Sequence, residues 1–421
     1  MSKFKDKIEA IFRSKEIRSK ILFSIMIMIV FRLLSAIPVV GITSDSIRKL
    51  FEGTELGDML STVSGGVLES ASIVAIGLTP YINASIIFQL LGTVIPKLDE
   101  IQKEGQDGRR KIQMYTRILA VPLAILQSFV IYATLRGFGL VEQLDALHLI
   151  TMCATLTAGS MIMMWFGELV SEDGLGGGSS YLIMLGILSG VPGTLRTLYQ
   201  TMDPFQKWLY SIIMAVMVIA VVVVTEAERR VTIQYSRRQR AGGALESYIP
   251  IKLTQSGVMP VIFASAFISF PQLIGKLLIS RDISETVTNI SQRVLDVLSN
   301  AYISNAIQFV LIVAFSFFYL TVVFKTDELA ENLQKQGAFI QGIRPGENTS
   351  EYLRKISVRL TVVGALFLAI LAILPSILEQ LGLISGAIIS GTGLLIVVGV
   401  ILDIKRDVES MVTVRSYDKY L

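Results

Sequence analysis

Long apolar runs alternate with shorter polar stretches along nearly the whole chain. A run of about 20 apolar residues can cross a hydrocarbon core of about 30 Å as a helix, because a helix rises about 1.5 Å per residue. A backbone in lipid must satisfy its own polar groups, which favours helices. The pattern predicts an all-α polytopic membrane protein with ten transmembrane helices, near residues 21–40, 73–94, 117–135, 150–169, 180–199, 208–226, 256–275, 303–324, 358–378 and 385–403.

Composition agrees with the membrane class. Of the 421 residues, 52% are hydrophobic and only 17% are charged, which is less charge than soluble domains usually carry. Residues 1–20 are highly charged and predict a cytoplasmic amphipathic segment rather than a cleavable signal peptide. The only cysteine, Cys153, excludes an intrachain disulfide framework and offers no metal cluster.

The distribution of basic residues predicts the orientation. With the N-terminus inside, 29 of the 38 Lys and Arg side chains fall in cytoplasmic segments and eight fall outside, while Arg32 lies within the first predicted span. Cytoplasmic loops carry such an excess of positive charge in membrane proteins. Both termini are therefore expected in the cytoplasm.

Ten spans with both ends inside divide into five and five. A half with an odd number of spans inverts the half that follows, and inverted halves place a functional path at their interface. We expect an N-terminal half over 21–200, an external hinge connection over 201–207 and a C-terminal half over 208–404. A cytoplasmic tail, 405–421, follows.

Few residues suit catalysis. The only histidine, His148, lies in a polar connection outside the predicted spans, and the His-Glu-x-x-His motif of zinc proteases is absent from the sequence. The stretch "GLGGGSS", residues 174–180, lacks the Gly-Lys-Ser/Thr ending of a phosphate-binding loop and joins two spans. It predicts a tight hairpin. We expect a protein that is not an enzyme and needs no cofactor.

A solute transporter with an inverted repeat is the main alternative. Ion-coupled transport generally needs acidic or basic groups inside the membrane. The predicted spans hold few of them: Arg32 lies inside the first span, and Glu168 lies near a cytoplasmic helix end. This scarcity favours a passive pore.

Two cytoplasmic loops, 227–255 and 325–357, are longer than a connection requires. In the first, the alternation in "RRVTIQYS" predicts a short strand. The second predicts a helix, a tip punctuated by Gly and Pro, and another helix. Basic loops of this length suit contact with RNA phosphates or an acidic protein surface.

Several motifs, in order, resemble those of the SecY family, the large subunit of the bacterial protein-translocation channel. They are "VFRLLSAIPVVGI" (30–42), "SGGVLESASIVAIGLTPYINASIIFQLL" (64–91), "EIQKEGQDGRRKIQMYTR" (100–117), "WFGELVSEDGLGGGSS" (165–180), "GVMPVIFAS" (257–265), "GAFIQGIRPGENTSEYL" (337–353) and "GTGLLIVVGVILD" (391–403). The resemblance implies a passive channel in the bacterial cytoplasmic membrane, with two five-helix halves in a clamshell around a central pore. Unfolded polypeptides that bear signal sequences would cross it, and membrane segments would leave sideways into lipid.

The resemblance also implies a ring of aliphatic side chains at the narrowest point of the pore. Branched aliphatic groups can surround a moving chain without binding any one sequence, and a dry constriction resists ions. Ser179 departs from the aliphatic residue usual in the family. The ring positions are Leu78, Ile82, Ser179, Ile183, Ile262 and Ile396.

A plug and a lateral gate follow from the same resemblance. The plug would occupy 59–72. The gate lies between spans 2–3 and 7–8 and has polar positions at Gln89 and at Thr254, where the family more often has Asn. Four residues of the plug would fold back into the outer funnel on a flexible joint of three: Leu60, Ser61, Thr62 and Val63, then Ser64, Gly65 and Gly66.

Partners are implied at the cytoplasmic loops. Arg344 resembles the tip arginine that engages the SecA motor, and Arg237 and Arg238 lie where the other loop meets the ribosome or the motor. Arg109 and Arg110 belong to the first basic loop. The family further implies a SecE-like subunit, a SecG-like subunit and membrane lipid as partners, and no DNA.

Overall fold

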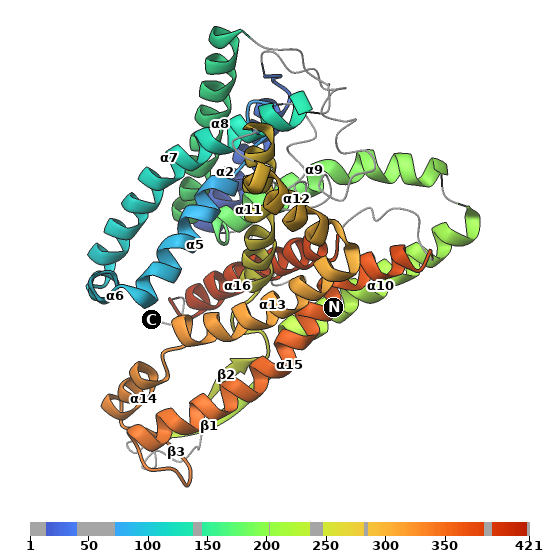
Figure 1. The fold of residues 1–421 in the computed structure, drawn as a ribbon. Helices are drawn as coiled ribbons and strands as arrows, with labels where there is room; N and C mark the ends of the chain where they lie inside the picture. Colours follow the sequence, from blue (N-terminus) through green and yellow to red (C-terminus); the bar gives the residue numbers. More distant parts are fainter. Residues whose placement is uncertain are drawn as a thin grey trace. The chain divides into compact units, whose positions relative to one another are not determined.

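The computed structural model describes residues 14–39, 72–137, 145–201, 203–235, 247–281, 285–382 and 390–418, and these are mostly helical (Figure 1). Each predicted span overlaps a helix. The longer helices are α2 (Lys15–Ser35), α5 (Thr79–Val94), α7 (Gln106–Gly137), α8 (Ala146–Asp173), α9 (Gly178–Thr201), α10 (Pro204–Glu226), α11 (Met259–Arg281), α12 (Glu285–Ser299), α13 (Ala301–Val323), α15 (Glu347–Gln380) and α16 (Gly391–Asp418).

Among the described residues, five helices are long and apolar enough to cross a membrane. The number rises to six if α5 and the short helix α6 (Pro96–Lys103), which meet at a bend of 108°, form one broken span. Several helices run well past the predicted spans at their charged ends: α7 begins at Gln106, α15 begins at Glu347, and α16 continues to Asp418. Much of the predicted basic loop before the third span is therefore helical.

The chain packs as two compact units. The first comprises Met1–Met202, Ser265–Ser304 and Gly386–Leu421, and the second comprises Asp203–Ala264 and Asn305–Ser385. In the first unit α5 packs on α7, α7 on α8, and α8 on α9, so helices that are close in sequence lie side by side (Figure 1). Helix α16 joins them through α9, and α2 joins them through α8.

The predicted second span began at residue 73, and the structure of residues 72–78 shows that this boundary is wrong. Helix α5 begins only at Thr79, and the preceding residues form turns, with Gly77 at φ 59°. Pro80 sits in the first turn of α5, where a missing N–H leaves no helical hydrogen bond unmade. Proline therefore starts this helix and does not kink it.

A three-stranded antiparallel sheet lies in the second unit, in the order β2-β1-β3. The predicted strand is confirmed as β1 (Glu228–Tyr235), and the predicted helix–tip–helix is confirmed as α14 (Thr326–Lys335), the tip and α15. The sequence patterns missed β2 (Ser247–Lys252) and β3 (Ala338–Ile340). Both long loops thus meet in one sheet, which lies beside the lower end of α15 in Figure 1.

Candidate functional site

Residues 72–78 are held on two sides by other parts of the first unit. The Ile73 amide donates to the Ile37 carbonyl at 3.0 Å, just beyond α2. The Ser160 hydroxyl of α8 donates to the Gly77 carbonyl at 2.9 Å. A Cβ at Gly159 would lie only 2.0 Å from the Ile73 carbonyl oxygen, so the two backbones touch. These contacts set the position of Leu78, which directly precedes α5.

The "GLGGGSS" stretch is a tight hairpin between α8 and α9, as predicted. A Cβ at Gly178 would lie 1.8 Å from the Gly167 carbonyl oxygen, and the Gly178 amide donates to the Ser171 hydroxyl at 2.9 Å. The Gly176 amide, in a turn at φ 75°, donates to the Asp407 carboxylate of α16 at 2.9 Å. The turn therefore fixes where α9, with its two predicted pore-ring positions, begins.

The five predicted pore-ring residues of the first unit lie on three helices or their immediate starts. Leu78 and Ile82 are buried at the start of α5, Ile183 is buried on α9, and Ile396 is buried on α16. Ser179 is half-buried in the first turn of α9. The sixth residue, Ile262, is buried in the first turns of α11, in the second unit.

A cavity of about 110 Å³ in the first unit is lined by Leu78 and Ser179, so these two pore-ring positions share one space. Its wall also holds an ion pair, in which Arg117 Nε lies 2.6 Å from Glu168 Oε1. The Glu168 side chain is only 20% exposed, and its charge is matched directly by the arginine. The two charged groups therefore form a polar wall in the cavity that Leu78 and Ser179 line.

Arg32, the charged residue of the first span, also has a partner. Its guanidinium donates to the Ser189 hydroxyl, which links the end of α2 to α9. The last polar candidate, His148, is exposed in the first turn of α8 rather than in a connection. Within the described segments, no three His, Cys, Asp or Glu side chains lie close enough together to hold a metal ion.

The two predicted gate residues carry buried oxygens that lack a hydrogen-bond partner among the described residues. Gln89 Oε1 lies on α5 in the first unit, and Thr254 Oγ1 lies before α11 in the second. The neighbouring Gln255 donates to the Ser357 hydroxyl of α15 at 3.2 Å. A Cβ at Gly364 would lie 2.5 Å from the Leu253 carbonyl oxygen, so the segment before α11 is pressed against α15.

The loop platform consists of the three strands, α14 and the first turns of α15. Its buried apolar core explains why the loops fold into one body, because strands and helices contribute to the same cluster. The core residues are Val231, Ile233, Ile251, Leu333, Ala338, Ile340 and Leu353.

Arg344 lies exposed at the tip of the platform, between β3 and α15. Three glycines with positive φ shape this region, at Gly337, Gly342 and Gly346. The Thr349 hydroxyl donates to the Arg344 carbonyl at 2.9 Å, which anchors the backbone and leaves the guanidinium outward. The platform thus presents this cation on a fixed turn.

The outer surface of the sheet is also basic. The Arg230 guanidinium lies 4.7 Å above the Tyr248 ring and donates from Nε to Glu228 at 2.9 Å. The hydrogen bond to Glu228, and then the nearby Tyr248, raise the pKa of Arg230. Its neighbour Arg229 is exposed.

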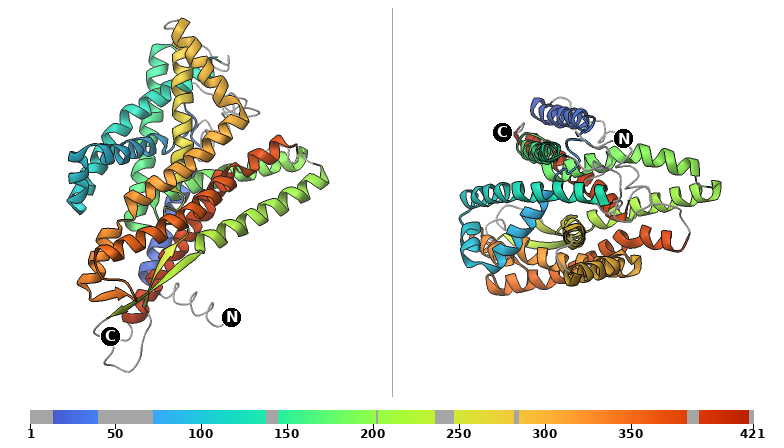
Figure 2. Two further views of the ribbon diagram at one scale, coloured as in Figure 1. Left: turned by 60° about the horizontal axis from the view of Figure 1, so that its bottom comes forward. Right: turned by 45° about the horizontal axis from the view of Figure 1, so that its top comes forward.

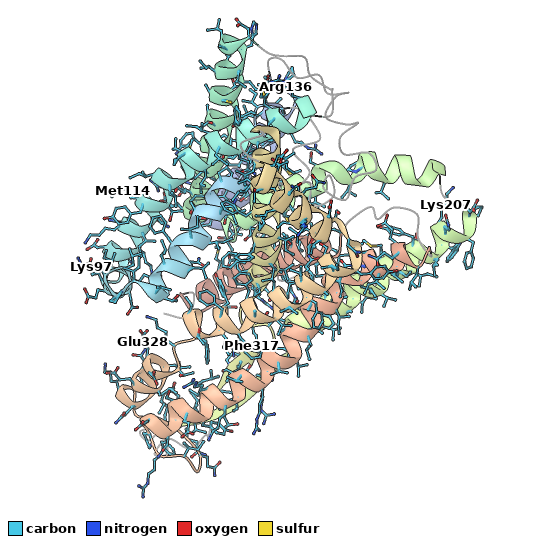
Figure 3. The ribbon with its side chains drawn as sticks, viewed as in Figure 1. Lys97, Met114, Arg136, Lys207, Phe317 and Glu328 are labelled. Carbon is cyan, nitrogen blue, oxygen red and sulfur yellow. The ribbon has the colours of Figure 1, made fainter. Side chains whose placement is uncertain are left out.

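In the first unit, Arg109 and Arg110 are exposed in the first turns of α7. Figure 3 shows the start of α7 in the region of Lys97 and Met114, at the opposite end of α7 from Arg136. The plug and joint residues, 59–71, and the pair Arg237 and Arg238 lie outside the described residues.

Sequence patterns missed the side chains that position the candidate residues. Ser160, Ser171 and Asp407 each accept or donate a bond that fixes a turn. The only signal in the sequence was the density of Gly and Ser in these apolar helices, which is typical of close helix packing in membranes. Nothing in the order of residues indicates which backbone each of them contacts.

Comparison with known proteins gives the family. A family profile described as SecY matches residues 72–405. Protein translocase subunit SecY of Streptomyces scabiei is 36% identical over 432 aligned positions, which cover 97% of this chain and 98% of that protein. The namesake from Bacillus subtilis (strain 168) is 36% identical over 430 positions, covering 97% of each. The chain belongs to the SecY family.

Solved structures agree on the fold of this SecY-family chain. One described as a protein conducting channel has a TM-score of 0.69 at 18% identity, and covers 94% of this chain and 93% of that one. Sec61 in the canine ribosome–channel complex has a TM-score of 0.65 at 18% identity, with the same coverage. The polytopic helical fold expected from the sequence is therefore confirmed.

Proposed function

We propose that this SecY-family chain is the central pore-forming subunit of the Sec translocon, a passive protein-conducting channel. One observation carries the proposal: translocase subunits named SecY are 36% identical to it over 97% of its length. The substrates would be unfolded polypeptides with signal sequences, and membrane segments would pass sideways into lipid. SecA or the translating ribosome would drive transport, and the chain itself would catalyse no reaction.

The architecture proposed for this function has ten spans in two inverted halves, 21–200 and 208–404, joined by the external connection 201–207. Both termini would lie in the cytoplasm, and the protein would sit in the bacterial cytoplasmic membrane. The 29-to-8 distribution of basic residues supports this orientation. It would place the loop platform on the cytoplasmic side.

The pore constriction would be formed by the six ring positions. Five of them are aliphatic and buried, and Ser179 lines a cavity together with Leu78. A ring of this chemistry binds weakly to any passing side chain, so a substrate can leave it. The plug, 59–72, would close the idle channel from the outer side, with Ser64, Gly65 and Gly66 as its joint.

The lateral gate would place Gln89 and Thr254 along its seam. The buried oxygens of both side chains lack a partner among the described residues. Hydrogen bonds between membrane helices contribute only about 0.6 kcal/mol on average. A seam whose polar side chains form few hydrogen bonds, each of them weak, can open for each signal sequence.

Motor and ribosome contacts would fall on the exposed arginines. Arg344 stands on the fixed tip of the platform, and Arg109 and Arg110 stand on α7. Arg237 and Arg238, which follow β1 in the chain, would also contact the ribosome or the motor. A SecE-like subunit would clamp the two halves, and a SecG-like subunit would join them.

Crosslinking tests the pore directly. A photoreactive probe is placed at Ile82 or at Ile262 in reconstituted channels, and a secretory precursor is stalled during transport driven by SecA and ATP. We expect crosslinks to the precursor from both positions. Matched probes at Ile118 and Val310, which are each 63% exposed on helices of the two units, should give none.

Two results would reject different parts of the proposal. A channel that transports the precursor but crosslinks from neither ring position would disprove the assignment of the ring. A reconstituted chain that binds neither ribosomes nor SecA and transports no precursor would instead favour a solute transporter.

A further inference from the structure

Helix α12 is amphipathic, and no element of the described residues covers its exposed apolar stripe. Ile290, Val294 and Val297 recur at intervals of four and three residues, so they share one face. Their side chains are 58%, 39% and 47% exposed. On the opposite face Gln292 donates to Asp296 at 3.1 Å, so the polar residues pair with each other in the open.

The connections of α12 keep it at the edge of a membrane. Three residues separate it from α11, whose stretch Met259–Gln272 is apolar, and one residue separates it from α13. Helix α13 begins a segment long and apolar enough to span a bilayer. Tyr302 in the first turn of α13 is 72% exposed, and tyrosine is typical of the boundary between headgroups and acyl chains. Helix α12 therefore cannot move far from that boundary.

A close contact sets the direction of α12. Leu295 Cγ lies 3.3 Å from where a Cβ of Gly275 would be, so the two helices nearly touch there. Gly275 lies six residues, about 9 Å, before the end of α11, and Leu295 lies ten residues, about 15 Å, after the start of α12. Helix α12 turns back obliquely beside the last turns of α11, as Figures 1 and 2 show. Its C-terminal end is thus the deeper one.

We infer that α12 is a membrane-surface helix whose stripe of Ile290, Val294 and Val297 inserts into the boundary between lipid headgroups and acyl chains. The bilayer is the occupant that the short connections bring within reach. An amphipathic helix that lies in this boundary buries its apolar face by about 5–10 Å. Arg293 flanks the stripe, is exposed and has no ion-pair partner among the described residues, so its guanidinium can reach lipid phosphates.

The stripe would insert into the leaflet on the other side of the membrane from the loop platform. Chain connectivity requires this if α11 and α13 both cross, because the platform strand β2 precedes α11 and the platform helix α14 follows α13. The inference does not depend on what passes through the protein, since it concerns only the lipid contact of one helix.

Environment-sensitive labels test the inference in the whole protein. Cys153→Ala provides a cysteine-free chain, into which single cysteines are placed at Ile290, Val294 or Val297 and labelled with a nitrobenzoxadiazole dye. Gln292 and Asp296 supply matched controls on the polar face. Each variant is reconstituted into vesicles of phosphatidylethanolamine and phosphatidylglycerol, after its thermal unfolding has been shown to match that of the parent.

We expect blue-shifted emission and quenching by spin-labelled lipids at the three stripe positions, strongest at Val297. The two polar-face labels should respond to aqueous iodide instead. Equal quenching of both faces by iodide would overturn the inference, because α12 would then lie in water. Protection of the stripe from both quenchers would also overturn it, since a protein surface and not lipid would cover the helix.

Discussion

Residues 72–78 and the loop platform are held in place by different physical means. The tract is fixed by close backbone approach and by hydroxyl-to-carbonyl bonds, as at Gly159 and Ser160. The platform is fixed by a buried apolar core that includes Leu353, with strand pairing around it. In lipid, apolar side chains gain little free energy by packing together, because lipid tails are as apolar as they are. Membrane helices therefore associate through small residues and polar contacts. In water, burial of apolar surface supplies the stability.

The largest effect is expected from a change at the tip of the platform that alters its function and not its stability. Arg344→Glu reverses the charge at the tip and leaves the core untouched, so we expect SecA-driven transport to be abolished, because a carboxylate would repel the acidic surface that the arginine contacts. The rate is measured with reconstituted channels and a secretory precursor. Arg354→Glu, an exposed arginine on α15, is the control. A normal rate with Arg344→Glu would show that the tip arginine is dispensable.

Truncation of the platform core comes next. Leu353 is fully buried, so Leu353→Ala should destabilise the platform by about 2–5 kcal/mol. Hydrogen exchange of the amides of β1 and β3 reports this local stability. The exposed neighbour Arg354→Ala should leave the exchange rates unchanged. Equal rates in both variants would mean that the apolar cluster does not hold the strands.

A methyl group at the touching backbones should have a smaller effect. Gly159→Ala places a carbon 2.0 Å from the Ile73 carbonyl oxygen, and we expect a loss of about 1–3 kcal/mol and a lower Tm in detergent. Gly167→Ala in the same helix meets nothing closer than 3.6 Å, so its Tm should be equal or slightly higher. If both variants melt alike, close approach does not position residues 72–78.

The smallest effect is expected from the hydroxyl contact. Ser160→Ala removes the bond to the Gly77 carbonyl and should cost about 0.6 kcal/mol, the average for bonds between membrane helices. Ser128→Ala removes a bond to Ala124 within its own helix and should cost less. A loss with Ser160→Ala as large as that with Gly159→Ala would reverse the proposed order of the two contacts.

The elements that followed from local pattern were predicted well. The apolar runs lie on helices, and the alternation in residues 229–236 indicated β1 because alternate side chains face the platform core. The strand β3 has only three residues and adjoins glycine, so no periodicity could indicate it. Helix α12 was not predicted, because the helix is short and its sequence as a whole is too polar to resemble a span.

The candidate residues likewise divide into those that the sequence indicated and those that only the structure shows. The resemblance named the ring positions, and four of the five in the first unit are buried. No pattern indicated that Ser179 and Leu78 would line one cavity, or that Asp407 would hold the turn before α9. These contacts join residues far apart in the chain, and the local order of amino acids carries no record of them.

By itself the sequence determined that this is a polytopic helical membrane protein of the SecY family, because hydrophobic length and motif order are local properties that need no partner. Only the tertiary structure decided that residues 72–78 leave the helix, that the two long loops pair in one sheet, and that α12 exposes an apolar stripe. Each of these depends on which backbone or side chain approaches from elsewhere, and contact between distant segments is settled by packing rather than by local preference.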